Sequence, residues 1–130
     1  MAQEKIYRAL ARAFAAEGVD TIFVLTGDAN MHWEVAFSEL PGTRSFHVRH
    51  EHCACAMASA YARANDRVGV ASVTCGPGLT QIFTALVTAA RARIPLVVLA
   101  GESPLQSAWY NQHLDQAPLV EAAGVRYVAV

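Results

Sequence analysis

The sequence predicts an α/β fold, a doubly wound, mostly parallel sheet with helices on both faces. Short apolar runs typical of buried strands alternate along the chain with longer segments of helical periodicity. Turns containing glycine follow several strands, as expected where a strand leads into a crossover helix. A chain of 130 residues is long enough to bury a core, so residues 1–130 are expected to form one domain.

The first half of the chain begins with an amphipathic helix, which Gly18 is expected to stop. The next strand is apolar throughout, which indicates burial on both faces. An alanine-rich helix then starts at His50 and ends in Asn-Asp turn chemistry. The expected elements are helix 3–17, strand 21–25, turn 26–30, a helix through Trp33 and Phe37 to Pro41, strand 44–48, and the helix from His50 to a turn at 63–67.

The second half repeats the alternation of strand, turn and helix. Its strands are the apolar runs that begin at Val68 and Leu96. A polar loop containing Trp109 and His113 separates the second of these strands from a short helix. The expected elements are strand 68–74, turn 75–78, helix 79–93, strand 96–100, turn 101–104, helix 115–123 and strand 126–130.

Composition narrows the classes of partner. Ten basic and eleven acidic residues give a net charge of −1, so neither nucleic acid nor an anionic membrane is an expected partner. Only 16% of the residues are charged while 54% are hydrophobic, which indicates apolar surface covered by another domain or subunit. The three cysteines are an odd number and no signal peptide precedes them, which favours reduced thiols and a cytoplasmic protein. No apolar run is long enough to span a bilayer.

Glu51 is the first candidate functional residue. It is expected in the first turn of a helix, at the carboxyl end of a strand, and that edge of an open α/β sheet is where ligands bind. Acidic residues also occur there simply because the helix dipole stabilises them. Ala54, Cys55 and Ala58 share the helical face of Glu51, and such small residues allow a flat ring to approach closely and leave the carboxylate poorly solvated.

Glycine-rich turns on the same rim are the second candidate. Gly27, the run Gly76-Pro77-Gly78 and Gly101 follow strands, where glycine permits close approach of the backbone to a ligand. Ordinary strand-to-helix turn chemistry accounts for them equally well. Neither the Walker pattern nor the Gly-x-Gly-x-x-Gly fingerprint is present, so these turns do not indicate those nucleotide sites.

Two further interpretations concern metal binding and nucleophilic catalysis. Histidines and cysteines cluster over 47–55, but their spacing matches neither a Cys-x-x-Cys pair nor a His-Glu-x-x-His helix, so no metal ligands are assigned. Cys75 could act as a nucleophile at a helix N-terminus, although a small buried residue is the simpler interpretation.

Several of these segments together resemble a known family. Val48-Arg49-His50-Glu51, Thr74-Cys75-Gly76-Pro77-Gly78 and Ile94–Gly101 occur in the order found in the N-terminal, pyrimidine-binding domain of thiamine-diphosphate enzymes of the acetolactate synthase-like group. The resemblance implies that Glu51 activates the cofactor by proton exchange with its aminopyrimidine ring. It also implies that a small 2-keto acid is the substrate.

The remaining residue roles follow from the same resemblance. The residues implied to bind the cofactor are Gly27, Thr74, Gly76, Pro77, Gly78 and Gln81. Gln112, with a one-residue ambiguity at Asn111, and His113 are implied to face the substrate. The loop 26–30 lacks the family's usual Pro-Gly, and Gln81 stands where Asn is usual; these departures concern the substrate and the pocket details more than the cofactor class.

No segment here resembles the family's diphosphate-binding domain, which holds the Mg²⁺ of the cofactor. The isolated chain is therefore expected to be inactive and to need that domain or subunit as a partner, whether it is a fragment of an enzyme or a separate subunit. A homo-oligomer is expected through the small-residue helix face around Ala54 and Ala58. The alternative is a non-catalytic assembly or regulatory module that keeps the fold.

Overall fold

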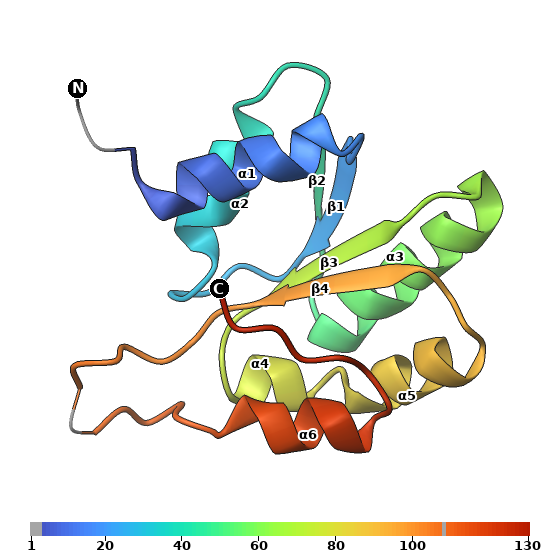
Figure 1. The fold of residues 1–130 in the computed structure, drawn as a ribbon. Coiled ribbons are helices and arrows are strands. Elements are labelled where there is room, and N and C mark those ends of the chain that lie inside the picture. The colour runs from blue at the N-terminus through green and yellow to red at the C-terminus, as the bar shows by residue number, and fades with distance from the viewer. Residues whose placement is uncertain (1–3, 108) are drawn as a thin grey trace.

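The computed structural model describes residues 4–107 and 109–130. Four parallel strands form one sheet in the order β2-β1-β3-β4, with helices on both sides (Figure 1). The predicted doubly wound α/β class is therefore confirmed. The elements are α1 (Ile6–Ala16), β1 (Thr21–Val24), α2 (Met31–Ser38), β2 (Arg44–His47), α3 (Glu51–Asn65), β3 (Gly69–Val73), α4 (Pro77–Thr80), α5 (Phe83–Arg91), β4 (Leu96–Ala100) and α6 (Gln116–Ala122).

The strand order creates a switch point between β1 and β3. These two strands are neighbours at the centre of the sheet, but the chain leaves β1 toward β2 on one side and leaves β3 toward β4 on the other. Connections that diverge in this way open a crevice at the carboxyl ends of the two strands, where open α/β sheets bind ligands. The loops 25–30 and 74–78 follow β1 and β3 at that edge of the sheet.

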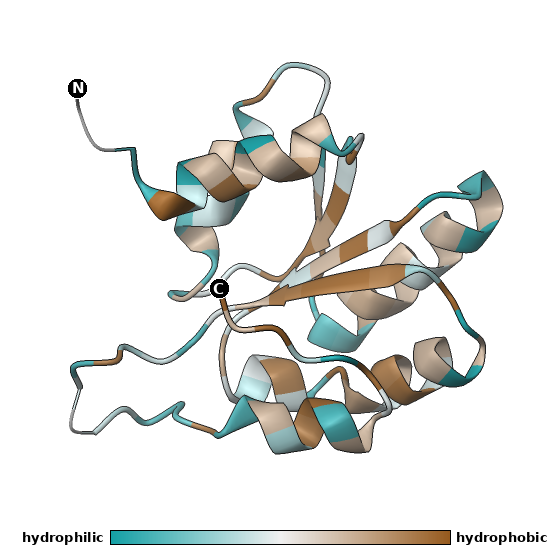
Figure 2. Cartoon of the chain, in the orientation of Figure 1, coloured by the Kyte–Doolittle hydropathy of each residue, from teal (hydrophilic) through white to brown (hydrophobic). Residues whose placement is uncertain are grey.

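One face of the sheet is covered by α1 and α2 (Figure 1). Ile22 of β1 and Val70 of β3 pack there against Trp33 and Phe37 of α2. The ring of Trp33 stacks on that of Phe37 with centroids 5.7 Å apart. All four residues of β1 are buried, as expected for a central strand in a doubly covered sheet. Figure 2 shows that the residues within β3 and β4 are mostly hydrophobic as well.

The other face is covered by α3 together with α4, α5 and α6 (Figure 1). Ala54 and Ala58 are fully buried against Phe23 and Ala71 of the sheet. This overturns the expectation that the Ala54 and Ala58 face associates with a second copy, because its own sheet already covers that face. Small side chains are used here to bring the helix close to the strands.

Two expected elements differ from the structure. The helix predicted over 79–93 is divided into α4 and α5, because the Ile82 N–H bonds to the Leu79 carbonyl, three residues back instead of four. The strand predicted at 126–130 is wrong. Val128 and Val130 are largely exposed, and no described strand pairs with the segment, so its alternating pattern has no ladder to join.

Candidate functional site

The centre of the candidate site is the tight approach of two loops at the switch point. A Cβ built on Gly27 would lie 2.7 Å from Thr74 Cβ, so only glycine fits in the first loop as it stands. A Cβ on Gly78 would lie 2.8 Å from Thr74 Cγ2. Three of the predicted cofactor residues therefore meet at one point. The Oγ1 of Thr74 is buried there and has no hydrogen-bond partner among the described residues.

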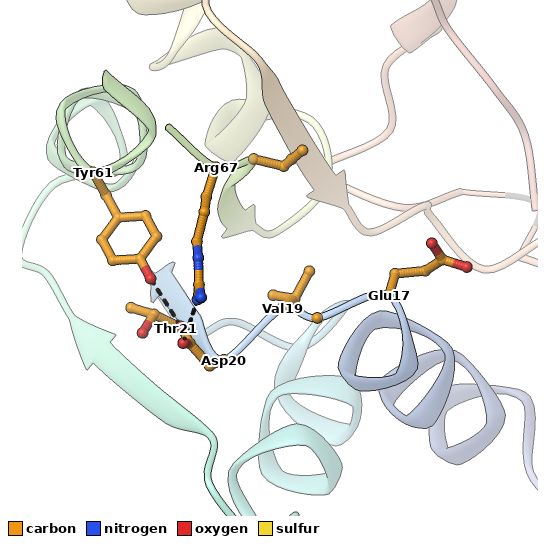
Figure 3. A pocket seen from close by; sticks show the side chains of 8 residues that line it. Glu17, Val19, Asp20, Thr21, Tyr61 and Arg67 are labelled. Atoms are coloured by element: carbon orange, nitrogen blue, oxygen red, sulfur yellow. Dashed lines mark hydrogen bonds and ion pairs between the residues drawn. The ribbon is translucent and has the colours of Figure 1, made fainter. Parts of the chain in front are cut away.

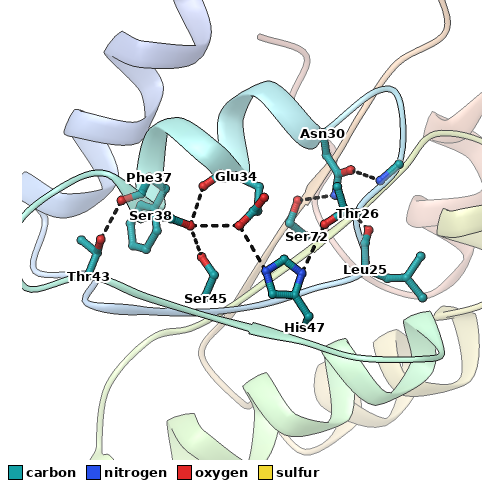
Figure 4. A network of polar contacts seen from close by, with 11 residues as sticks. Leu25, Thr26, Asn30, Glu34, Phe37, Ser38, Thr43, Ser45, His47 and Ser72 are labelled. Atoms are coloured by element: carbon teal, nitrogen blue, oxygen red, sulfur yellow. Dashed lines mark hydrogen bonds and ion pairs between the residues drawn. The ribbon is translucent and has the colours of Figure 1, made fainter.

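Asn30 ties the two central strands together at this point (Figure 4). Its side chain is buried, and its Oδ1 accepts a hydrogen bond of 2.7 Å from the Gly27 N–H. Its Nδ2 donates to the Leu25 carbonyl at 3.1 Å and to Ser72 Oγ at 3.0 Å. A fully satisfied buried amide rigidifies its surroundings, so Asn30 fixes the loop that carries Gly27. The sequence marked Asn30 only as a turn residue.

Two further loops pack on this centre. A Cβ on Gly101, after β4, would lie 2.6 Å from the Ala29 carbonyl oxygen. Gly76 has a φ of +55°, and a Cβ there would lie 1.9 Å from the Gln112 carbonyl oxygen. Glycines thus let the loops after β1, β3 and β4 and the segment before α6 contact one another through their backbones.

Glu51 begins α3 at the same edge of the sheet, after β2. Its side chain is half-buried, and no hydrogen bond or ion pair joins its carboxylate to another residue that the structure describes. The close approaches between the glycine loops do not include it. The N-cap of α3 is His50, whose Nδ1 accepts from the His52 N–H at 3.1 Å. Among the described residues, the carboxylate of Glu51 is therefore left without a partner.

Gln112 is held against the loop after β3. Its Oε1 accepts a contact of 3.6 Å from the buried Cys75 thiol and one of 3.4 Å from the Tyr110 hydroxyl. Desolvation raises the pKa of Tyr110, with Cys75 and Asp28 adding to the shift, which keeps the hydroxyl protonated as a donor. Cys75 thus has a packing and hydrogen-bonding role.

His113, the second predicted substrate residue, is exposed, and its Nδ1 lies 2.7 Å from the buried Ser103 Oγ. Ser103 and His113 line a pocket of about 330 Å³ together with Trp109 and Tyr110. Of the predicted cofactor residues, Pro77 and Gln81 are exposed on and after α4, while Gly76 and Gly78 are buried.

Gln116 at the start of α6 was not among the predicted residues. It is buried, and its Oε1 accepts from the Gly76 N–H at 3.2 Å. Its Nε2 donates to the Gly101 carbonyl and to Glu102 Oε2, both at 3.0 Å. No short motif signals such a residue, because its partners lie 14 to 40 positions away in the sequence.

A second polar network connects α2 with β2 beside the site (Figure 4). Glu34 is buried, and its Oε1 accepts from Ser38 Oγ at 2.9 Å and lies 3.4 Å from His47 Nε2. The other ring nitrogen of His47 lies 3.4 Å from Thr26 Oγ1. This network links a buried carboxylate to the residue that precedes Gly27.

Another pocket, of about 260 Å³, lies at the opposite edge, where the strands begin (Figure 3). Asp20 accepts hydrogen bonds of 2.9 Å there from the Tyr61 hydroxyl and from Arg67. Hydrogen bonds from Thr21 and Tyr61 lower the pKa of Asp20, and Arg67 and Arg44 contribute further. The Asp20 carboxylate is thus already paired within the fold, and none of the predicted site residues lines this pocket.

Within the described residues, no group of three or more His, Cys, Asp or Glu side chains is arranged to hold a metal ion. None of the helices in 4–107 and 109–130 is long and apolar enough to cross a membrane.

Comparison with known proteins identifies a family that matches most of the chain. The family described as thiamine pyrophosphate enzyme, N-terminal TPP binding domain, matches residues 4–124. The chain is 34% identical over 112 residues to acetolactate synthase 1, chloroplastic, of Oryza sativa subsp. japonica, which covers 86% of the chain and 17% of that relative.

Bacterial relatives give similar results. The acetolactate synthase large subunit of Parasynechococcus marenigrum is 39% identical over 99 residues, 74% of this chain and 16% of the relative. That of Buchnera aphidicola subsp. Schizaphis graminum is 37% identical over 91 residues, 70% of this chain and 16% of the relative. The matched segment is thus about a sixth of the length of each of these relatives.

Proposed function

Because this chain belongs to the family of thiamine pyrophosphate enzyme N-terminal TPP binding domains, we propose that it forms the pyrimidine-binding half of an acetolactate synthase-like 2-keto acid decarboxylase or carboligase. The other half is a diphosphate-binding domain or subunit that holds Mg²⁺. The working enzyme is a cytoplasmic homo-oligomer in this proposal.

The close packing of loops 25–30 and 74–78 at the switch point carries the proposal. Thr74 Oγ1 is buried there with no hydrogen-bond partner in the part of the chain that the structure describes, and the adjacent Gly27 leaves no side chain over it. A buried hydroxyl without a hydrogen bond destabilises the fold by about 1–3 kcal/mol. The amino group and ring nitrogens of an aminopyrimidine would supply the missing partner, so the residues present fit this group.

The cradle for the ring is assigned to the two loops that meet at Thr74. When bound, thiamine diphosphate supplies the electron sink for decarboxylation of a 2-keto acid. The chain's own contribution is to hold the pyrimidine flat against backbone atoms and exclude water from it. The residues assigned to this role are Gly27, Thr74, Gly76, Pro77, Gly78 and Gln81.

Glu51 is assigned to hold and return a proton at a ring nitrogen of the cofactor. Its half-buried carboxylate has no competing partner among the described residues, and the buried face of Ala54, Cys55 and Ala58 anchors its helix. Gln112 is assigned to face the 2-keto acid, along with His113.

The test combines the chain with a diphosphate-binding domain of a relative, thiamine diphosphate, Mg²⁺ and pyruvate, and measures release of carbon dioxide. Glu51→Gln is expected to lower the rate by about 10²–10⁴-fold, the usual contribution of a positioned proton-transfer group. Glu121→Gln, an isosteric change at an exposed position of α6, is the matched control and should keep full activity.

Equal rates for Glu51→Gln and the native chain would contradict the role of this carboxylate. No release with any partner domain, from a chain that is folded by circular dichroism, would instead support a non-catalytic assembly or regulatory module.

A further inference from the structure

Gln116 is a buried side chain whose position the proposed function does not use. It is 4% exposed and lies at the first residue of α6. Three hydrogen bonds of 3.0–3.2 Å engage both ends of its amide. They connect Gly76 after β3 with Gly101 and Glu102 after β4, next to the last backbone bond between these strands, from the Gly101 N–H to the Val73 carbonyl at 3.2 Å.

The contact with Gly76 is the informative one. Gly76 has φ +55° and ψ −107°, a backbone conformation that disfavours every residue except glycine. It directly precedes Pro77, so its peptide unit sets the direction in which α4 leaves the sheet. The Gly76 N–H is buried, and buried N–H groups need a partner. Gln116 Oε1 is that partner.

The other end of the Gln116 amide is anchored by Glu102. Glu102 Oε2 accepts from Gln116 Nε2 at 3.0 Å and lies 3.4 Å from the Tyr127 hydroxyl. Desolvation, followed by the charge of Glu102, raises the pKa of Tyr127, so this hydroxyl remains a donor. The Gly101 carbonyl accepts the second Nε2 proton at 3.0 Å. Gln116 is thus fixed in the one orientation that presents its oxygen to Gly76.

We infer that Gln116 is a positioning residue that fixes the Gly76–Gly78 turn against which the cofactor ring is held. The inference rests on the proposed function for the identity of the ring. Gln116 does not touch the cofactor. It acts by keeping the Gly76 peptide unit in place, and with it the backbone on either side of Pro77.

The first test uses the chain alone and measures amide hydrogen exchange by NMR. Gln116→Ala is expected to speed exchange at Gly76 about tenfold, which corresponds to the loss of about 1.4 kcal/mol from one hydrogen bond. Amides of β3 report any global loss of stability and serve as the internal reference. Gln106→Ala, the same change at an exposed position, should leave the Gly76 rate unchanged.

A polarity swap provides the rescue. Gln116→Glu keeps an acceptor for the Gly76 N–H but places a carboxylate against Glu102 and the Gly101 carbonyl, so the turn should loosen. Adding Glu102→Gln restores a donor on the facing side chain and should return Gly76 exchange toward the native rate. Unchanged exchange at Gly76 in Gln116→Ala, or a double variant no slower than Gln116→Glu, would overturn the inference.

The second test uses the assembly with a diphosphate-binding domain. Gln116→Ala is expected to raise the KM for thiamine diphosphate about tenfold, with a smaller change in kcat at saturating cofactor. The double variant Gln116→Glu/Glu102→Gln should have a KM closer to that of the native chain than Gln116→Glu alone. Altered exchange with an unaltered KM would refute a role toward the cofactor. An assembly whose native form has no turnover would refute the proposed function, whereas the exchange measurement would still decide whether Gln116 holds the turn.

Discussion

The contact between α3 and β3 yields the sharpest prediction about the fold. A Cβ built on Gly69 would lie 2.1 Å from the Ala58 carbonyl oxygen and 2.7 Å from its carbon, so the backbone of α3 rests directly on the strand. An ordinary carbon–oxygen contact is about 3.3 Å, so Gly69→Ala should push the helix outward by about 1 Å. No side-chain rearrangement can relieve the clash, because the obstructing atoms are main-chain atoms.

Forcing one extra methyl group into a packed interface costs about 1–3 kcal/mol. For a domain of this size, Gly69→Ala should lower the melting temperature by about 4–12 °C, at roughly 4 °C per kcal/mol. Thermal unfolding followed by circular dichroism measures this shift. NMR shifts along α3, from Glu51 to Ala58, should accompany it.

Gly124→Ala is the matched control, because its φ is +78° while the nearest atom to a Cβ there is 3.9 Å away. It should cost about 1–2 kcal/mol from backbone strain alone and leave the α3 resonances unmoved. A Gly69→Ala chain as stable as the native protein would show that α3 does not lie as close to β3 as described.

Two further predictions concern ionisable groups. Burial raises the pKa of Cys55 to about 11, so iodoacetamide near pH 8 should label the exposed Cys53 and spare Cys55, as mass spectrometry would show. Because the Cys55 thiol ionises at lower pH in the unfolded chain than in the folded one, the stability of the fold should also decrease as the pH rises from 9.0 toward 11. Hydrogen bonds from Thr21 and Tyr61 lower the pKa of Asp20, so its contribution to stability is present above pH 3.8 and is lost as the pH falls through the lowered value. Tyr61→Phe should weaken that pH dependence in urea unfolding, and an identical profile would contradict the assignment.

The periodicity of hydrophobic residues predicted most of the fold because it reflects which residues of each segment are buried. The apolar runs at Ile22 and Val97 became strands, and Gly18 ended the first helix with φ +84°. The same signal failed at 126–130, because an alternating pattern records a tendency to extend and not the presence of a neighbouring strand. It also grouped Ala54 with Ala58 correctly on one face but did not say which surface covers that face.

The sequence predicted the parts of the candidate site in which close approach of two loops requires glycine. Gly27, Gly76 and Gly78 do lie where loops meet. Gln116 and Asn30 were not predictable as organising residues, because a buried amide is recognised only by partners distant in the sequence.

The all-parallel sheet gives the domain two unequal ends. Every strand delivers its chain to the end where Gly27, Thr74 and Glu51 gather, while the return turns, including the one with Asp66 at φ +51°, lie at the other. That distal end is the place to attach a dye, an affinity tag or a surface tether. A molecule immobilised there would present the rim with Gly27, Thr74 and Glu51 outward, in one orientation, for tests of cofactor and partner-domain binding.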